Sequence, residues 1–354
     1  RKQRLEGLLA AATRAAETQD TRSLYNIVRS MAPKTARRRT RLRENTGVLC
    51  TPSQELEHFR YYFQQLYDQA ARHAPDTLLP ACGEGWCPTE AAIRKALLRL
   101  PAHKASPAHL PPNAAWKASA SIVAPLIERE LRSTWGRGDF TVPSRWKPAW
   151  LCLLPKPAKP GDAPSHYRPI GLLCPEGKSV LRAVVDAVRP YVAKGLTPYP
   201  QFAFVPGRAA QQALRLAGEH CTQVRASASA AGVSTHNRRA GIMPPALTGG
   251  LTISLDLAKA FDSVPHPSLL ESLLLLDVPR PLACILLQWH LDCQMHLGAP
   301  EDGCHVRLKA GLRQGCVAAP LLWGAFTYLI FRRIDSLLGE GWSKAHMLVY
   351  ADDH

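Results

Sequence analysis

The sequence lacks a run of apolar residues long enough to cross a bilayer. Such a span needs about 18 residues or more, and the longest apolar run, residues 320–331, is shorter. We therefore predict a buried core helix at this run and no membrane partner. A secretory signal segment is also absent from the sequence.

No two of the ten cysteines form a C-x-x-C pair. Cys82 and Cys87 are spaced like half of a zinc site, but no second pair of Cys or His follows at a useful spacing. The cysteines also show no regular framework of the kind found in small secreted proteins. We interpret them as reduced thiols and predict an intracellular protein.

Acidic residues are few compared with basic ones. The chain has 28 Asp and Glu against 44 Lys and Arg, which gives a net charge of +16 and a pI near 9.6. A basic run occupies residues 37–43. Strongly basic chains usually bind polyanions, and nucleic acid is the commonest of these. The alternative is a basic solvated surface with no such partner.

The apolar pattern predicts helices joined by Pro-rich and Gly-rich loops, in keeping with the 30 prolines. Helical spacing is found over residues 52–70, 89–101, 119–137 and 176–195, and the first 45 residues are basic and helical in pattern. Alternation over residues 146–154 predicts a strand that ends at Pro155. Residues 222–249 are low in complexity, and we expect a disordered insertion there.

Two segments place carboxylates at the ends of short apolar stretches. Residues 251–257 read LTISLDL, a strict alternation that predicts a strand with Asp256 on its polar face. Residues 347–353 read MLVYADD and end in two adjacent acids, Asp352 and Asp353. Each acid has a simpler interpretation, since a lone Asp is common on an edge strand and an Asp pair is common in a hairpin turn.

Taken together, the two acidic segments predict a metal site. Carboxylates that lie close together repel each other, and a bound divalent cation relieves that repulsion. Oxygen ligands of this kind suit Mg²⁺ or Mn²⁺. Two such ions, about 3.5–4 Å apart, can stabilise the attacking and leaving oxygens of a phosphoryl transfer.

The order of these motifs resembles that of reverse transcriptases of non-LTR, LINE-like retroelements. Residues 255–262 read LDLAKAFD, and YADD follows almost one hundred residues later. Three more segments are similar to motifs of the same family: KPAKPG with YRPI (156–161 and 167–170), QFAFVPGR (201–208) and LRQGCVAAPLL (312–322). The sequence departs from the family at Ala203, at residues 317–319 and at Trp323, where glycine, PLS and phenylalanine are usual.

The resemblance implies an α+β fold of the right-hand polymerase type, with fingers, a palm whose antiparallel sheet packs on helices, and the thumb missing. The implied divisions are a basic helical N-terminal extension over residues 1–80, fingers with the start of the palm over 81–221, the insertion over 222–249, and a truncated palm over 250–354. Because the chain begins with Arg1 and ends within a motif, we expect it to be part of a longer product.

The resemblance also implies roles for individual residues. Asp256, Asp352 and Asp353 would be catalytic and would hold two Mg²⁺ or Mn²⁺ ions, with help from the Leu257 carbonyl. The residues that would bind the deoxynucleotide are Lys156, Lys159, Arg168, Phe261, Gln314 and Gly315. Those that would bind nucleic acid are Lys178, Arg208, Arg313 and Tyr350. Phe261 would exclude a ribose 2′-hydroxyl, and Gly315 would let the backbone approach closely.

The implied function is RNA-directed DNA polymerase activity, with an RNA template, a DNA primer and deoxynucleoside triphosphates as partners and substrates. Such an enzyme would act in a nuclear or cytoplasmic ribonucleoprotein, and its oligomeric state is open. Two alternatives remain, a group II intron-type reverse transcriptase or maturase, and an inactive remnant that only binds nucleic acid. The ordered motifs disfavour a plain basic structural protein.

Overall fold

A computed structural model describes most of the chain as two compact units, residues 1–41 and 42–354. The described residues are 2–31, 42–44, 46–71, 79, 84–157, 159–230, 236, 239–241, 250–298 and 303–352. Each unit is treated by itself. None of the described helices combines the length and the apolar character that a membrane span requires.

The first unit is a pair of helices, α1 (Lys2–Glu17) and α2 (Thr21–Met31), that pack on each other. Asp20 lies between them, and its carboxylate accepts a hydrogen bond from the Ser23 amide at 3.0 Å. This bond lies at the start of α2, where free amides need acceptors. The expected helical character of this segment is confirmed, whereas residues 37–41 of the basic run lie outside the described residues.

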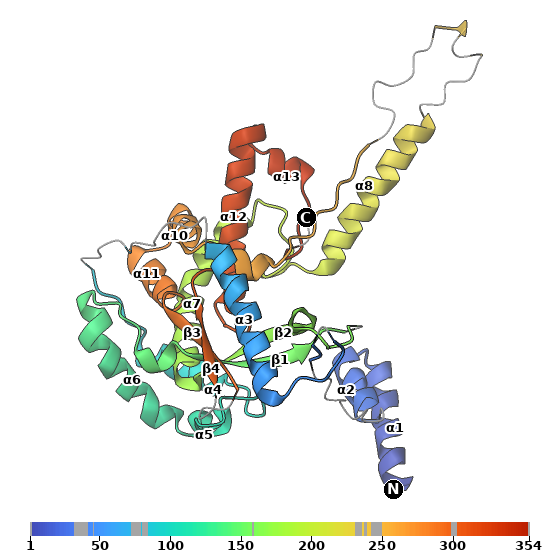
Figure 1. The fold of residues 1–354 in the computed structure, drawn as a ribbon. Helices are drawn as coiled ribbons and strands as arrows, with labels where there is room; N and C mark the ends of the chain where they lie inside the picture. Colours follow the sequence, from blue (N-terminus) through green and yellow to red (C-terminus); the bar gives the residue numbers. More distant parts are fainter. Residues whose placement is uncertain are drawn as a thin grey trace. The chain divides into compact units, whose positions relative to one another are not determined.

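The second unit is built around a four-stranded mixed sheet (Figure 1). Its strands are β1 (Ala149–Pro155), β2 (Tyr167–Leu173), β3 (Cys293–Leu297) and β4 (Cys304–Leu308), in the order β2-β1-β3-β4. The β1–β2 and β3–β4 pairs are antiparallel, and β1 and β3 run parallel. The α+β class and the strand ending at Pro155 are confirmed, but the sheet is mixed and not purely antiparallel.

Helix α3 (Pro52–Ala71) lies across one face of this sheet (Figure 1). Its buried Phe63 and Tyr67 share a core with Met295 and Val306 of the sheet. The start of the helix is capped, because the Thr51 hydroxyl accepts from the Gln54 amide at 3.3 Å and the Gln54 side chain accepts from the Thr51 amide at 2.8 Å. The packing of Phe63 and Tyr67 on the sheet makes α3 part of the second unit, whereas the resemblance implied that residues 1–80 form an N-terminal extension.

A larger core gathers the remaining helices around α7 (Pro175–Leu196). The helices are α4 (Glu90–Leu98), α5 (Asn113–Ala118), α6 (Ala120–Thr134), α10 (His266–Leu275), α11 (Arg280–Gln288), α12 (Ala319–Leu338) and α13 (Trp342–His346). Four fully buried tryptophans, Trp135, Trp146, Trp289 and Trp323, lie in this core, and the Trp146 and Trp289 rings stack with centroids 5.8 Å apart. The core helix expected at residues 320–331 is confirmed as part of α12.

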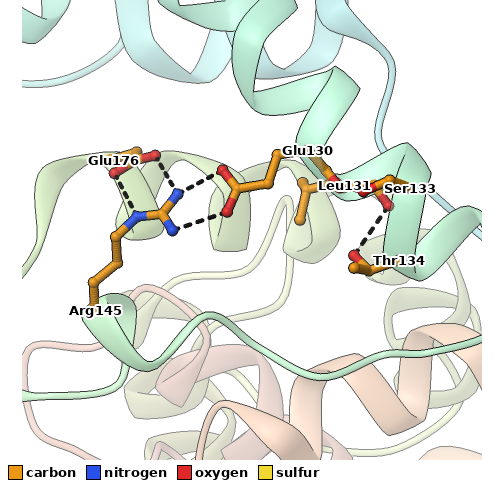
Figure 2. Close-up of polar contacts among 6 residues, drawn as sticks. All are labelled: Glu130, Leu131, Ser133, Thr134, Arg145 and Glu176. Atoms are coloured by element: carbon orange, nitrogen blue, oxygen red, sulfur yellow. Dashed lines mark hydrogen bonds and ion pairs between the residues drawn. The ribbon is translucent and has the colours of Figure 1, made fainter.

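An arginine connects two helices at the edge of this core (Figure 2). Arg145, in the short 3₁₀ helix η2 (Ser144–Trp146), binds Glu130 of α6 through two bonds of 2.8 and 2.6 Å and Glu176 of α7 at 3.1 Å. The hydrogen bond to Glu130 raises the pKa of Arg145 above its ordinary value. Because the side chain is half exposed, its main effect is to fix the direction of the two helices.

Two expectations of the sequence were wrong in detail. Residues 251–257 are not a strand, because only Asp256 forms a β-bridge and Leu251 and Ile253 are 80% and 67% exposed. An alternating pattern forms a strand only where a neighbouring strand pairs with it and its apolar face is covered. Residues 222–230, expected to be disordered, are the last turns of α8 (Ala210–Ala230), since alanine favours helix. Most of residues 231–249 lie outside the described residues.

Gly177 supplies a test of the packing between α7 and η2. A Cβ atom added there would lie 2.6 Å from the buried Trp146 ring. We expect Gly177→Ala to lower the free energy of unfolding by about 1–3 kcal/mol through this overlap, measured by urea denaturation. The matched control is Gly218→Ala in α8, where a Cβ would meet no atom within 4 Å. Equal effects of the two substitutions would contradict the packing.

Candidate active site

Residues 350–352, here called the terminal turn, are fastened to the segment after α7. Gln201 and Val349 form a parallel β-bridge. The Phe202 amide donates to the Val349 carbonyl at 2.8 Å, and the Val349 amide donates to the Pro200 carbonyl at 2.9 Å. The apolar stretch before the terminal acids thus forms isolated bridges at Val349 and Tyr350, and the partner of Val349 comes from the QFAFVPGR motif.

The Gln201 side chain holds the terminal turn directly. Gln201 is fully buried, and its carbonyl oxygen accepts from the Ala351 amide at 3.1 Å and from the Ala203 amide at 3.0 Å. Its amide group donates to the Ala351 carbonyl at 3.3 Å. Ala351 has a φ of 59°, a left-handed conformation that an L residue rarely adopts without such support.

Trp323 of α12 joins the terminal turn to the first acidic motif. Its indole N–H donates to the Ala351 carbonyl at 2.8 Å. The Phe261 ring stacks on the same indole, with centroids 4.9 Å apart and planes 20° apart. Phe204 meets Phe261 edge to face at 6.3 Å. Two motifs that are remote in sequence therefore meet on one side chain.

The structure describes two of the three predicted catalytic acids. Asp256 is exposed and lies in a β-bridge, and Asp352 is partly buried in the terminal turn. Asp353 lies outside the described residues, and its role stays a prediction. Leu257, whose carbonyl was predicted to help, packs in part against the main core.

The chemistry of the acidic residues fits a divalent cation. Asp256 and Asp352 offer carboxylate oxygens, and within the described ranges neither has a Lys or Arg ion-pair partner. Hard oxygen donors that are free of competing cations suit Mg²⁺ or Mn²⁺. No three metal-ligating side chains gather within the described residues, and the predicted third ligand is outside them.

Three predicted nucleotide-binding cations lie within the β1–β2 hairpin, two in its loop and one on β2. Arg168 is exposed on β2, opposite Leu154 of β1. Lys156 follows β1, and its ammonium group donates to the Ser165 carbonyl at 2.8 Å. Lys159 is exposed. The three cations thus belong to one hairpin, and their contact with a triphosphate stays a prediction.

Gln314 and Gly315 lie against the backbone of β2. The Gly171 amide donates to the Gln314 carbonyl at 2.7 Å. Gly315 has a φ of 96°, and an added Cβ would lie 2.6 Å from the Gly171 carbonyl oxygen. The glycine is therefore needed for close approach of the backbone to β2, and its predicted approach to the nucleotide stays a prediction.

The prediction that Arg313 contacts nucleic acid was wrong. Its side chain is 1% exposed, and the guanidinium donates to the Lys147 and Trp289 carbonyls at 2.7 Å each. A guanidinium enclosed in this way has no face for a phosphate. It instead satisfies carbonyls beside the tryptophan core, because buried polar groups need partners.

Arg208 also differs from its prediction as a nucleic-acid contact. Its guanidinium donates to the carbonyls of Thr197, Tyr199 and Gln201, with 2.8 Å to Gln201. Burial lowers the pKa of Arg208 from its ordinary value. The structure thus assigns this side chain to shaping the loop that carries Gln201, one step behind the terminal turn.

Two predicted nucleic-acid contacts keep that status. Lys178 of α7 is partly buried, and burial lowers the pKa of its ammonium group, with Lys104 and Arg182 acting in the same direction. Tyr350 is 40% exposed at the terminal turn. Both side chains retain accessible surface for a phosphate or a base.

Sequence reasoning missed the supporting roles of Gln201 and Trp323. Gln201 stands in a recognised motif but was given no role, since a buried glutamine has no signal of its own. Trp323 was noted as a departure from phenylalanine. The departure supplies an indole N–H, which a phenylalanine lacks, and this N–H holds the Ala351 carbonyl.

Removing the Gln201 amide tests the anchoring of the terminal turn. Gln201→Ala leaves the Ala351 amide without its acceptor, which costs about 1–3 kcal/mol when the group stays buried. We expect faster hydrogen exchange in a peptide spanning residues 347–352, and a smaller increase for Trp323→Phe. The control is Gln211→Ala, at an exposed position in α8. Unchanged exchange in Gln201→Ala would contradict the anchoring.

Comparison with known proteins gives a family for most of this region. A family model described as reverse transcriptase (RNA-dependent DNA polymerase) matches residues 154–354. The match begins within β1 and includes the hairpin cations, the Gln201 loop, both acidic motifs and the terminal turn.

Curated relatives agree with the family model. The chain is 25% identical over 187 residues to a probable RNA-directed DNA polymerase from transposon BS of Drosophila melanogaster. The aligned residues cover 52% of this chain and 18% of that protein. It is 26% identical over 216 residues to the corresponding protein from transposon X-element of the same fly, covering 60% and 21%.

A third relative is the Pol polyprotein from the type-1 retrotransposable element R2 of Nasonia vitripennis, 33% identical over 108 residues, or 29% of this chain and 10% of that protein. The chain thus spans about a fifth or less of the length of these relatives. Since the family model matches more than half of the chain, the chain belongs to the reverse transcriptase (RNA-dependent DNA polymerase) family.

Proposed function

We propose that this chain is the polymerase core of a LINE-like retroelement protein that copies RNA into DNA. It adds deoxynucleotides to a primer 3′-hydroxyl on an RNA template. The observation that carries the proposal is the meeting of the two acidic motifs at Trp323, through the Phe261 ring and the Ala351 carbonyl. A retroelement polymerase of this kind acts in a ribonucleoprotein in the nucleus or cytoplasm.

Asp256, Asp352 and Asp353 are the residues that would hold Mg²⁺ or Mn²⁺, with the Leu257 carbonyl as a further donor. The ions, when bound, lower the pKa of the primer hydroxyl and neutralise the triphosphate and the leaving pyrophosphate. The protein contributes placement. Gln201 and Trp323 fix the backbone that carries Asp352, so its carboxylate needs little reorganisation when substrate binds.

The β1–β2 hairpin supplies the positive charge for the incoming nucleotide. Arg168 offers a planar fork that can bind two phosphate oxygens, and Lys156 and Lys159 act as point charges. Phe261 forms a rigid wall at the sugar, because its ring is held between Trp323 and Phe204. A net charge of +16 supports binding of template and primer through their phosphates.

A single substitution at the terminal turn tests the polymerase function. We expect the protein to extend oligo(dT) on poly(rA) with Mg²⁺ or Mn²⁺, and Asp352→Asn to reduce the rate by about a hundredfold or more, because it removes a charged metal ligand. Binding of RNA should persist, since the change makes the chain more basic.

The matched control is Asp277→Asn, at an exposed aspartate that follows α10. It should extend the primer like the unchanged protein. Full extension by Asp352→Asn would overturn the proposed function. RNA binding without extension by the unchanged protein would instead indicate a chain that only binds nucleic acid.

Phe261 is expected to set the preference for deoxynucleotides. Phe261→Ala removes the ring next to the sugar, and we expect the use of UTP relative to dTTP to rise about tenfold, measured as the ratio of kcat/KM values. Phe261→Tyr keeps the ring and should keep the ratio. An unchanged ratio in Phe261→Ala would show that the wall lies elsewhere.

A further inference from the structure

Asp262 is a buried carboxylate to which the proposed mechanism gives no task. It lies in the 3₁₀ helix η4 (Ala260–Ser263), directly after Phe261, and is 7% exposed. Both of its oxygens face the side-chain amide nitrogen of Gln314, at 3.3 and 3.2 Å. The pair joins the first acidic motif to the LRQG motif, and its two residues are 52 positions apart in the sequence.

The backbone on both sides of this pair is fixed. On the side of Asp262, the Leu312 amide donates to the Phe261 carbonyl at 2.7 Å. Gly311 packs so closely that an added Cβ would lie 2.5 Å from the Asp262 carbonyl oxygen. On the other side, the Gly171 amide holds the Gln314 carbonyl at 2.7 Å. Gln314 therefore has its main chain set, and its side-chain amide remains to be oriented.

The surroundings of Asp262 act on the pKa of its carboxyl in opposite directions. Burial raises the pKa of this carboxyl to about 6, while the hydrogen bond from Gln314 and the positive charges of Lys259 and Lys156 act in the opposite direction. Burial and, to a lesser extent, the charge of Asp262 raise the pKa of Tyr62 and of Tyr67, both on α3. At neutral pH the group is mostly ionised, and it titrates in the range where the enzyme can be assayed.

We propose that Asp262 is a positioning residue that orients the Gln314 side chain for binding of the incoming deoxynucleotide. This inference rests on the proposed function. An ionised carboxylate can only accept hydrogen bonds, so it holds the amide nitrogen of Gln314 toward itself and directs the amide oxygen away. A protonated carboxyl can also donate to that oxygen, and the amide can then turn over. Ionisation of Asp262 therefore selects one orientation of Gln314.

The first experiment follows the KM for dTTP as a function of pH in primer extension on poly(rA). In the unchanged protein KM should fall as pH rises through about 6, where Asp262 ionises. Asp262→Asn keeps an acceptor but not the charge, so its KM should not depend on this ionisation and should be about threefold to tenfold higher at neutral pH. Asp262→Ala should show the larger increase, while kcat changes little in both.

A double substitution separates positioning from a merely structural role. If Asp262 acts through Gln314, then Asp262→Asn should add nothing to the KM of a Gln314→Ala protein. A structural carboxylate would affect both backgrounds equally. The control is Asp292→Asn, at an exposed aspartate before β3, which should leave KM and its pH dependence unchanged.

Thermal unfolding gives a readout that does not need activity. A raised pKa means that the neutral form is favoured in the folded protein, so the contribution of Asp262 to stability is fully present at low pH and is lost as pH rises through about 6. Asp262→Asn should remove that loss. The inference would be overturned if Asp262→Asn still lost stability as pH rises through about 6. It would also be overturned if an active Asp262→Asn protein kept the pH dependence of KM seen in the unchanged protein. Absence of extension by the unchanged protein would overturn the proposed function instead.

Discussion

The candidate site depends on how one strained residue is held. Ala351 has a left-handed backbone between the tyrosine and the aspartate of the terminal turn. Its carbonyl accepts hydrogen bonds from Gln201 and Trp323, and its amide donates one to Gln201. Each of these partners comes from a different motif. Because the turn is short, the position of the Asp352 carboxylate follows directly from that of Ala351.

Two arginines stabilise the backbone around these contacts. Arg208 gathers the carbonyls of the loop that carries Gln201, and Arg313 gathers carbonyls beside the tryptophan core. Both are basic residues that a sequence analysis counts toward nucleic-acid binding. Their guanidinium groups instead replace water around main-chain oxygens, which suits a planar group with five donors. The net charge of the chain therefore overstates the charge that its surface presents.

Several helices of the fold could be predicted from the sequence, but α8 could not, because its last turns were expected to be disordered. Helices α3, α7 and α12 follow apolar patterns that act within a few residues of sequence, and β1 ends at the expected proline. The prediction of a strand over residues 251–257 was wrong. An alternating pattern shows which side chains share a face, but it does not show whether a neighbouring strand is there to pair with. The boundary after Arg41 was missed, since the contacts of α3 with the sheet have no local signal.

The sequence by itself determined the chemistry of this protein, because the order of its acids, cations and motif glycines is read along the chain. It identified the family and predicted which residues would carry charge to the site. Only the tertiary structure decided which of those charges are available. Arg313 and Asp262 lie in motifs yet are enclosed, and burial and hydrogen bonding depend on segments that meet only after folding. A residue type states what a group can do, and its neighbours in space decide what it does.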